Sequence, residues 1–350
     1  MSILNISDFI NKSESYTKDS FPNLDVNELL NSAINGKVNN KTVYSAVFSL
    51  LGKEVVNAIR VLANVMLIVV IHSLLKSISE NLGNSGVSKI TYYVEYILIV
   101  TLVLVSFSEV ITITKNSIQN LVGFSYSLLP ILLALVAATG SVISVSVVQP
   151  VILGSVVFIS SIVQNAVIPI LLIGTVLGVI SNISEKVQVE KLSKFFKSGI
   201  VWFLGVVVTL FVGVLSIEGT LSSSVDGVTA KTTKAVVSNF VPVVGKALGD
   251  SVDTVLGCTN ILKNATGLVG IVIIIGICAM PIIKLTVLSI SFQLVSALSE
   301  PIADKNIVKL LSHIGDVFKI VLAIMFFIAV MLIVGITIII KISNGGLMYR

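Results

Sequence analysis

The chain has 350 residues, of which 55% are hydrophobic and only 12% are charged, and its mean hydropathy is +1.04. A soluble domain carries roughly a quarter charged residues, so this composition excludes an ordinary soluble protein and indicates an integral membrane protein. The net charge of +5 comes from lysines beside apolar runs, which is typical of membrane helices, and no nucleic-acid binding is expected.

Two regions differ in composition. Residues 1–41 form a polar segment, in which Asp25 is a candidate cap for a short helix. Residues 42–350 form a multispanning membrane domain, which opens with an amphipathic helix over 42–57 that lies on the membrane or enters it obliquely.

Apolar runs long enough to cross about 30 Å of hydrocarbon recur along this domain. They predict an all-α, polytopic fold with about seven transmembrane helices, and six to eight fit the pattern. The seven main spans are expected at 59–75, 92–113, 128–148, 151–180, 199–217, 268–298 and 320–342.

Prolines and polar residues predict where the first spans begin and end. Residues 115–127 are expected to form a short link, and Pro130 falls in the first turn of the third span, where proline is tolerated. Gln149 and Pro150 are expected to break the chain. Pro169 divides the long fourth run into one kinked helix or two half-helices.

The sixth run, 268–298, is too long for one straight crossing, and Pro281 is expected to break it. Lys284 follows three residues later, where it would contact a pore, an ion or a partner. The alternative is that it lies near an interface and extends its ammonium group to water. Residues 299–319 are polar and are expected to contain a surface helix from about Asn306.

Other polar residues occur inside the apolar runs. Glu109 is expected at a membrane interface. Hydrogen bonding between helices, or to backbone groups that prolines leave free, is the expected role of Gln149, Gln164, Asn165 and Gln293. The spacing of Gly174 and Gly178, and of Gly245 and Gly249, permits close helix approach.

The stretch 218–260 lies between the fifth and sixth runs and has apolar residues at helical spacing, with lysines and aspartates largely on other faces. Pro242 interrupts the pattern, which predicts two amphipathic helices that meet at a break. This hairpin is expected to be re-entrant, as an assembly or pore-facing element, or to rest on the bilayer. The candidate residues are Asp226, Lys231, Lys234, Asn239, Pro242, Gly245, Lys284, Gln164 and Asn165.

The string SIEGTLSSSVDGVTAKTTKAVVSNFVPVVGKALGDSVDTVLG, at 216–257, resembles the stage III sporulation protein AE family. Four further strings are similar in the same order, and the similarity is expected from about Val43 to the C-terminus: SLLPILLALVAATGSV, QPVIL, QNAVIPI and LKNATGLVGI. Family members are multispanning membrane proteins of endospore-forming bacteria.

The resemblance to this family implies a role in a channel complex between the mother cell and the forespore. It also implies that this complex is similar to specialised secretion systems. It implies a location in the mother-cell membrane around the forespore. Implied partners are the other stage III sporulation proteins, a partner in the forespore membrane, and further copies of the chain.

A secondary transporter for a small solute is the alternative, because broken helices with polar groups at membrane depth are typical of transporters. No Walker A, HExxH, GxSxG or Cys/His pattern occurs in the sequence. We therefore expect neither an enzyme nor a cofactor or metal site.

Overall fold

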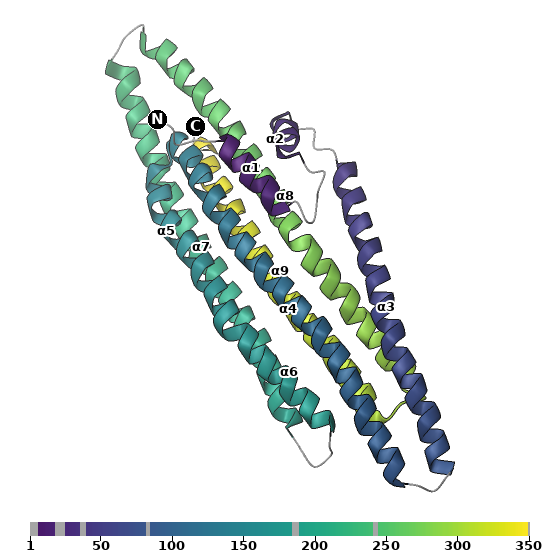
Figure 1. Cartoon of the computed structure of the whole chain (residues 1–350). Helices are drawn as coiled ribbons and strands as arrows, with labels where there is room; N and C mark the ends of the chain where they lie inside the picture. Colours follow the sequence, from purple (N-terminus) through teal and green to yellow (C-terminus); the bar gives the residue numbers. More distant parts are fainter. Residues whose placement is uncertain are drawn as a thin grey trace.

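The computed structural model describes residues 6–17, 25–35, 40–81, 85–183, 189–240 and 244–348, and within these ranges the chain forms helices and no strands. The helices are α1 (Ile6–Thr17), α2 (Val26–Ile34), α3 (Asn40–Asn81), α4 (Ser85–Ala138), α5 (Val142–Ile162), the π-helical turn η1 (Val163–Val167), α6 (Ile168–Ile183), α7 (Glu190–Phe240), α8 (Val244–Ser299) and α9 (Lys305–Met348). Figure 1 shows the long helices running side by side as an elongated bundle.

Six helices in the described ranges are long and apolar enough to cross a membrane. Their apolar stretches are Glu54–Ile71, Tyr92–Ala138, Ser144–Ile183, Glu190–Ile217, Val255–Ser299 and Lys305–Lys341. The predicted all-α, polytopic membrane fold is therefore confirmed, with six candidate spans where seven main spans were expected.

The expected link at 115–127 is wrong, because α4 runs through it without a break. Ile118, Leu121 and Phe124 recur there at helical spacing and are all 0% exposed, so this stretch packs into the bundle as a helix. Consequently Pro130 lies inside α4 rather than in a first turn. The helix instead ends before Gly140, whose φ of 91° is a conformation that glycine adopts without strain.

Two expected proline breaks are also wrong. Pro150 lies inside α5 and Pro281 inside α8, and both helices continue past them. At Pro169 the chain stays helical as well, but the turn before it widens into η1. A proline ring crowds the carbonyl four residues earlier, here that of Asn165 in η1, and a wider turn relieves that contact. One continuous helical rod with a distorted turn is therefore observed.

The expected helix from about Asn306 is present, but its expected location at the surface is wrong. Helix α9 begins at Lys305 and packs against α4, α5, α6, α7 and α8. Its first turns carry fully buried side chains at helical spacing, among them Ile307, Leu310, Ile314 and Val317. The lysines and serines of this stretch lie between those positions, so the mean polarity of residues 299–319 does not reveal the buried apolar stripe.

The stretch 218–260 continues the two long helices that flank it, since α7 extends to Phe240 and α8 starts at Val244. Figure 1 shows these extensions at one end of the bundle. Residues 241–243, with Pro242, lie outside the described residues, as do the side chains of 218–254. Whether this hairpin enters the membrane stays a prediction.

Candidate functional site

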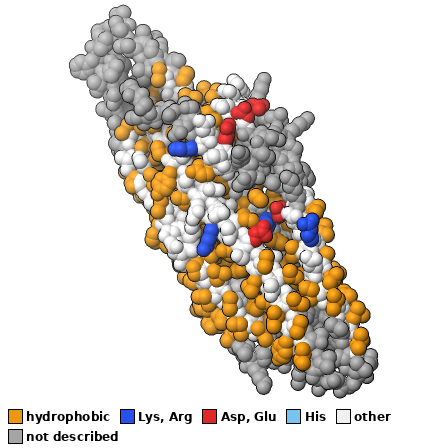
Figure 2. All heavy atoms as spheres, in the orientation of Figure 1, with side chains coloured by type: hydrophobic (Ala, Val, Ile, Leu, Met, Phe, Trp, Pro, Cys, Tyr) orange, Lys and Arg blue, Asp and Glu red, His pale blue; other side chains and the backbone are white. Residues whose placement is uncertain are grey.

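Charged and polar side chains from three helices line one groove in this apolar bundle. Helix α3 contributes Glu54 and Asn57, helix α4 contributes Ser106 and Glu109, and α8 contributes Lys284. The groove encloses a cavity of about 260 Å³, and its apolar walls are Ala58, Val61 and Leu288. Figure 2 shows one face of the molecule, on which charged side chains lie at mid-height and above, with hydrophobic side chains below them.

Helical spacing explains why these residues meet. Glu54 and Asn57 are three positions apart on α3, as are Ser106 and Glu109 on α4, so each pair shares one helix face. The neighbouring face of α4 is apolar and buried, with Phe107 in the core, and it fixes the rotation of that helix. The packing of α3, α4 and α8 against one another then brings the polar faces together.

An ion pair joins two walls of the groove. The Lys284 ammonium donates a hydrogen bond to Oε1 of Glu109. The Lys284 side chain is 13% exposed, whereas the Glu109 side chain is 58% exposed. Lys284 thus depends on its partner for charge compensation, while Glu109 faces outward from the same groove.

The carboxylate of Glu54 completes the set of charges. This residue is only 8% exposed and faces the cavity. Within the described part of the chain it makes neither a hydrogen bond nor an ion pair. With both carboxylates and the ammonium ionised, the groove carries one uncompensated negative charge.

The groove lies among apolar stretches of three helices. Its residues on α3, α4 and α8 fall within Glu54–Ile71, Tyr92–Ala138 and Val255–Ser299.

A second polar cluster joins α6, α7 and α9. Nζ of Lys197 lies 3.1 Å from Nδ1 of His313, and the Ser193 hydroxyl donates to the carbonyl of Gly174 over 2.6 Å. A Cβ added at Gly178 would lie 2.0 Å from Cε1 of His313. The close approach that was predicted from the spacing of these two glycines is therefore confirmed.

Side-chain hydrogen bonds connect the antiparallel helices α8 and α9 at regular intervals. The Ser289 hydroxyl donates to the carbonyl of Gly315 (3.0 Å), and Ser296 donates to that of Val308 (2.9 Å). The donors are seven residues apart, and so are the acceptors, as an antiparallel helix pair requires. Gln293 donates to Asp316 across the same interface (3.3 Å), which confirms its predicted role between helices.

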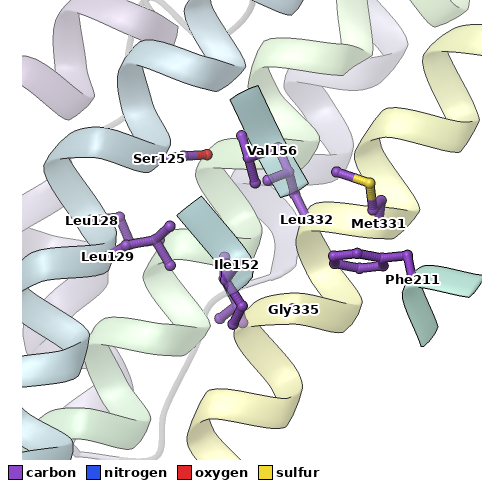
Figure 3. Close-up of a pocket in the computed structure, with 10 residues that line it drawn as sticks. Ser125, Leu128, Leu129, Ile152, Val156, Phe211, Met331, Leu332 and Gly335 are labelled. Carbon is purple, nitrogen blue, oxygen red and sulfur yellow. The ribbon is translucent and has the colours of Figure 1, made fainter. Parts of the chain in front are cut away.

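The interior of the bundle contains a small apolar void where α4, α5, α7 and α9 meet (Figure 3). Its volume is about 10 Å³, and Phe211, Met331 and Gly335 are among the residues around it. The one hydroxyl at its edge, on Ser125, donates to the carbonyl of Leu121 over 2.7 Å. This void is at the lower limit for a single water molecule and is a packing defect rather than a ligand site.

The structure assembles only part of the predicted site. Lys284 lines the groove, and Glu109, which was expected at an interface, is its ion-pair partner. Gln164 and Asn165 lie in η1, away from the groove lining, and Asn165 donates to Ser161 over 3.1 Å.

The hairpin candidates fall on residues whose side chains the structure does not describe. On α7, the side chains of Asp226, Lys231, Lys234 and Asn239 lie outside the described residues, as does Pro242 in the connection. Gly245 lies in the first turn of α8, and its surroundings are likewise undescribed. Their roles stay predictions.

Sequence reasoning missed Glu54, Asn57 and Ser106. The amphipathic stretch 42–57 was expected to lie on the membrane or to enter it obliquely, and its last polar residues were not considered for a site. In the structure α3 runs unbroken from Asn40 to Asn81. The sequence signal for this part of the site was the pair Glu54 and Asn57, which share one helix face directly before an apolar run.

Comparisons with known proteins show the family of the chain. The family model described as stage III sporulation protein AE matches residues 24–343. The chain belongs to this family. A stage III sporulation protein AE from Bacillus subtilis (strain 168) is 30% identical over 305 residues, which cover 87% of this chain and 76% of that protein. The match starts at residue 24, inside the polar N-terminal segment and earlier than expected, and no solved structure matches the chain.

Proposed function

We propose that this member of the stage III sporulation protein AE family is a membrane component of a channel complex between the mother cell and the forespore. It acts there in the mother-cell membrane around the forespore, in a structural or channel role without catalysis. Membership in the family supports a role in sporulation. The finer role is supported by the groove between α3, α4 and α8.

The charged groove is the observation that carries this proposal. Ionised groups at membrane depth are costly in lipid and are retained mainly where water or protein surrounds them. Glu109 is largely exposed, and it lies within the apolar stretch of α4. In a channel complex, water in a passage or a neighbouring subunit would cover this charge. Other stage III sporulation proteins, a forespore-membrane partner or a second copy of the chain would supply that neighbour.

The length of the apolar helices supports an assembly as well. The stretch Val255–Ser299 has 45 residues and is about 68 Å long at 1.5 Å per residue. A bilayer has about 30 Å of hydrocarbon, and a tilt of about 40° accommodates only some 40 Å. The remaining apolar surface needs contact with protein, which subunits of a complex would provide.

Deletion and complementation in the spore-forming host test the proposal. We expect deletion of the gene to block sporulation after engulfment, and the purified chain to associate with other stage III proteins. Lys284→Leu should lower spore yield at normal protein levels, whereas Lys305→Leu, a change of an exposed lysine outside the groove, should not. Normal sporulation of the deletion strain would refute the role.

A secondary transporter is the second candidate, and two observations favour it. The rod α5–η1–α6 is distorted before Pro169, and the groove presents charged groups inside an apolar bundle. If the purified chain alone moves a defined solute across liposomes, this candidate displaces the channel proposal.

A further inference from the structure

We infer that the groove between α3, α4 and α8 is a binding site for the primary ammonium group of a small organic cation. This inference specifies the ligand of the groove that supports the proposed function, and its biological setting rests on that function. Binding itself needs no partner protein, so it can fail or succeed independently of the sporulation role.

The charge balance selects a cation. Lys284 already compensates Glu109, whereas Glu54 is buried, faces the cavity and has no partner in the described part of the chain. A buried carboxylate without a partner is costly, and a cationic ligand in the cavity would remove that cost. A neutral or anionic ligand would leave Glu54 uncompensated.

The hydrogen-bonding groups fit an ammonium group. A primary ammonium has three N–H donors and no acceptor. The groove offers the carboxylates of Glu54 and Glu109 and the side-chain carbonyl of Asn57, all of which accept. The hydroxyl of Ser106 donates to the carbonyl of Leu102 over 3.2 Å, which leaves its oxygen free to accept.

The size and walls of the cavity limit the rest of the ligand. A volume of about 260 Å³ is somewhat below the range of drug-sized pockets, which starts at about 300 Å³. The apolar side chains Ala58, Val61 and Leu288 form a surface that suits a short alkyl chain. No group of three His, Cys, Asp or Glu side chains is close enough to hold a metal ion anywhere in the described ranges. A small alkylammonium therefore fits better than a metal ion.

Binding of radiolabelled butylammonium to the purified full-length chain in lipid nanodiscs tests the assignment. We expect saturable binding that empty nanodiscs lack, that unlabelled butylammonium displaces, and that neutral butanol does not. Glu54→Gln preserves the shape of the side chain and should weaken binding at least tenfold. Glu300→Gln removes an exposed carboxylate outside the groove and should leave binding unchanged.

A second variant distinguishes loss of the binding site from misfolding of the Glu54→Gln chain. Asn57 is exposed, so Asn57→Leu should fold, remove one acceptor and narrow the cavity, and binding should again weaken. Absence of saturable binding to the unmodified chain overturns the assignment. So does binding that survives both groove variants, or displacement by sodium at the same concentration as butylammonium, which would indicate an inorganic cation.

Discussion

The two members of the Lys284–Glu109 pair should differ in their effect on stability. Glu109→Gln leaves the Lys284 ammonium behind, whereas Lys284→Leu leaves the Glu109 carboxylate behind. The cost of breaking an ion pair depends on how deeply the remaining charge is buried. The ammonium is 13% exposed and the carboxylate 58% exposed, so loss of the glutamate should cost more.

The magnitudes follow from these exposures. Loss of one partner from a fully buried pair costs about 3–5 kcal/mol. The Lys284 side chain keeps 13% of its surface exposed, so we expect less than this full cost, about 2 kcal/mol, for Glu109→Gln. An exposed pair contributes roughly 0–1 kcal/mol, which sets the expectation for Lys284→Leu.

Thiol protection can measure both values. Cys278 on α8 is 1% exposed and reacts with a thiol reagent only when the bundle opens, so its labelling rate reports the open population. Cys258 is exposed and is first replaced by serine. Since about 1.4 kcal/mol corresponds to a factor of ten, Glu109→Gln should accelerate labelling roughly 30-fold and Lys284→Leu less than about fivefold. A larger acceleration for Lys284→Leu would refute the reasoning.

Three further predictions concern packing and the hairpin. Gly178→Leu should disrupt the contact of α6 with α9, because the new Cβ would overlap the ring of His313. Adding His313→Ala should partly restore the thiol protection of Cys278, and no recovery would contradict the prediction. Ser289→Ala and Ser296→Ala should each cost about 0.6 kcal/mol and add when combined, whereas a strongly non-additive double variant would count against independent bonds. Pro242→Ala should lower spore yield at normal protein levels, and a normal yield would remove Pro242 from the candidate residues.

The apolar runs were sufficient to predict the helical membrane fold, because run length and hydrophobicity are properties of the local sequence. Helix ends were harder to predict. Pro150 and Pro281 stay within helices, where packing against neighbouring helices outweighs the local cost of a missing hydrogen bond. Gly140 ends α4 through a backbone conformation that no hydrophobicity pattern reveals.

The groove could be predicted only in part for a related reason. Lys284 was identified because a charge inside an apolar run is conspicuous on one helix. Its partner Glu109 is 175 positions away in the sequence, and Glu54 lies on a third helix. Which faces meet depends on the packing of α3, α4 and α8, and a single sequence does not contain that pairing.

The central position of α9 has a consequence for biogenesis. This helix packs against five helical segments that precede it, α4 to α8, yet the ribosome makes it after all of them. Until α9 is inserted, the faces of α4 and α7 that it covers have only lipid or the translocation machinery to contact. Final packing of the bundle must therefore follow translation of α9. Nascent chains stalled before Lys305 should be substrates for membrane quality-control proteases.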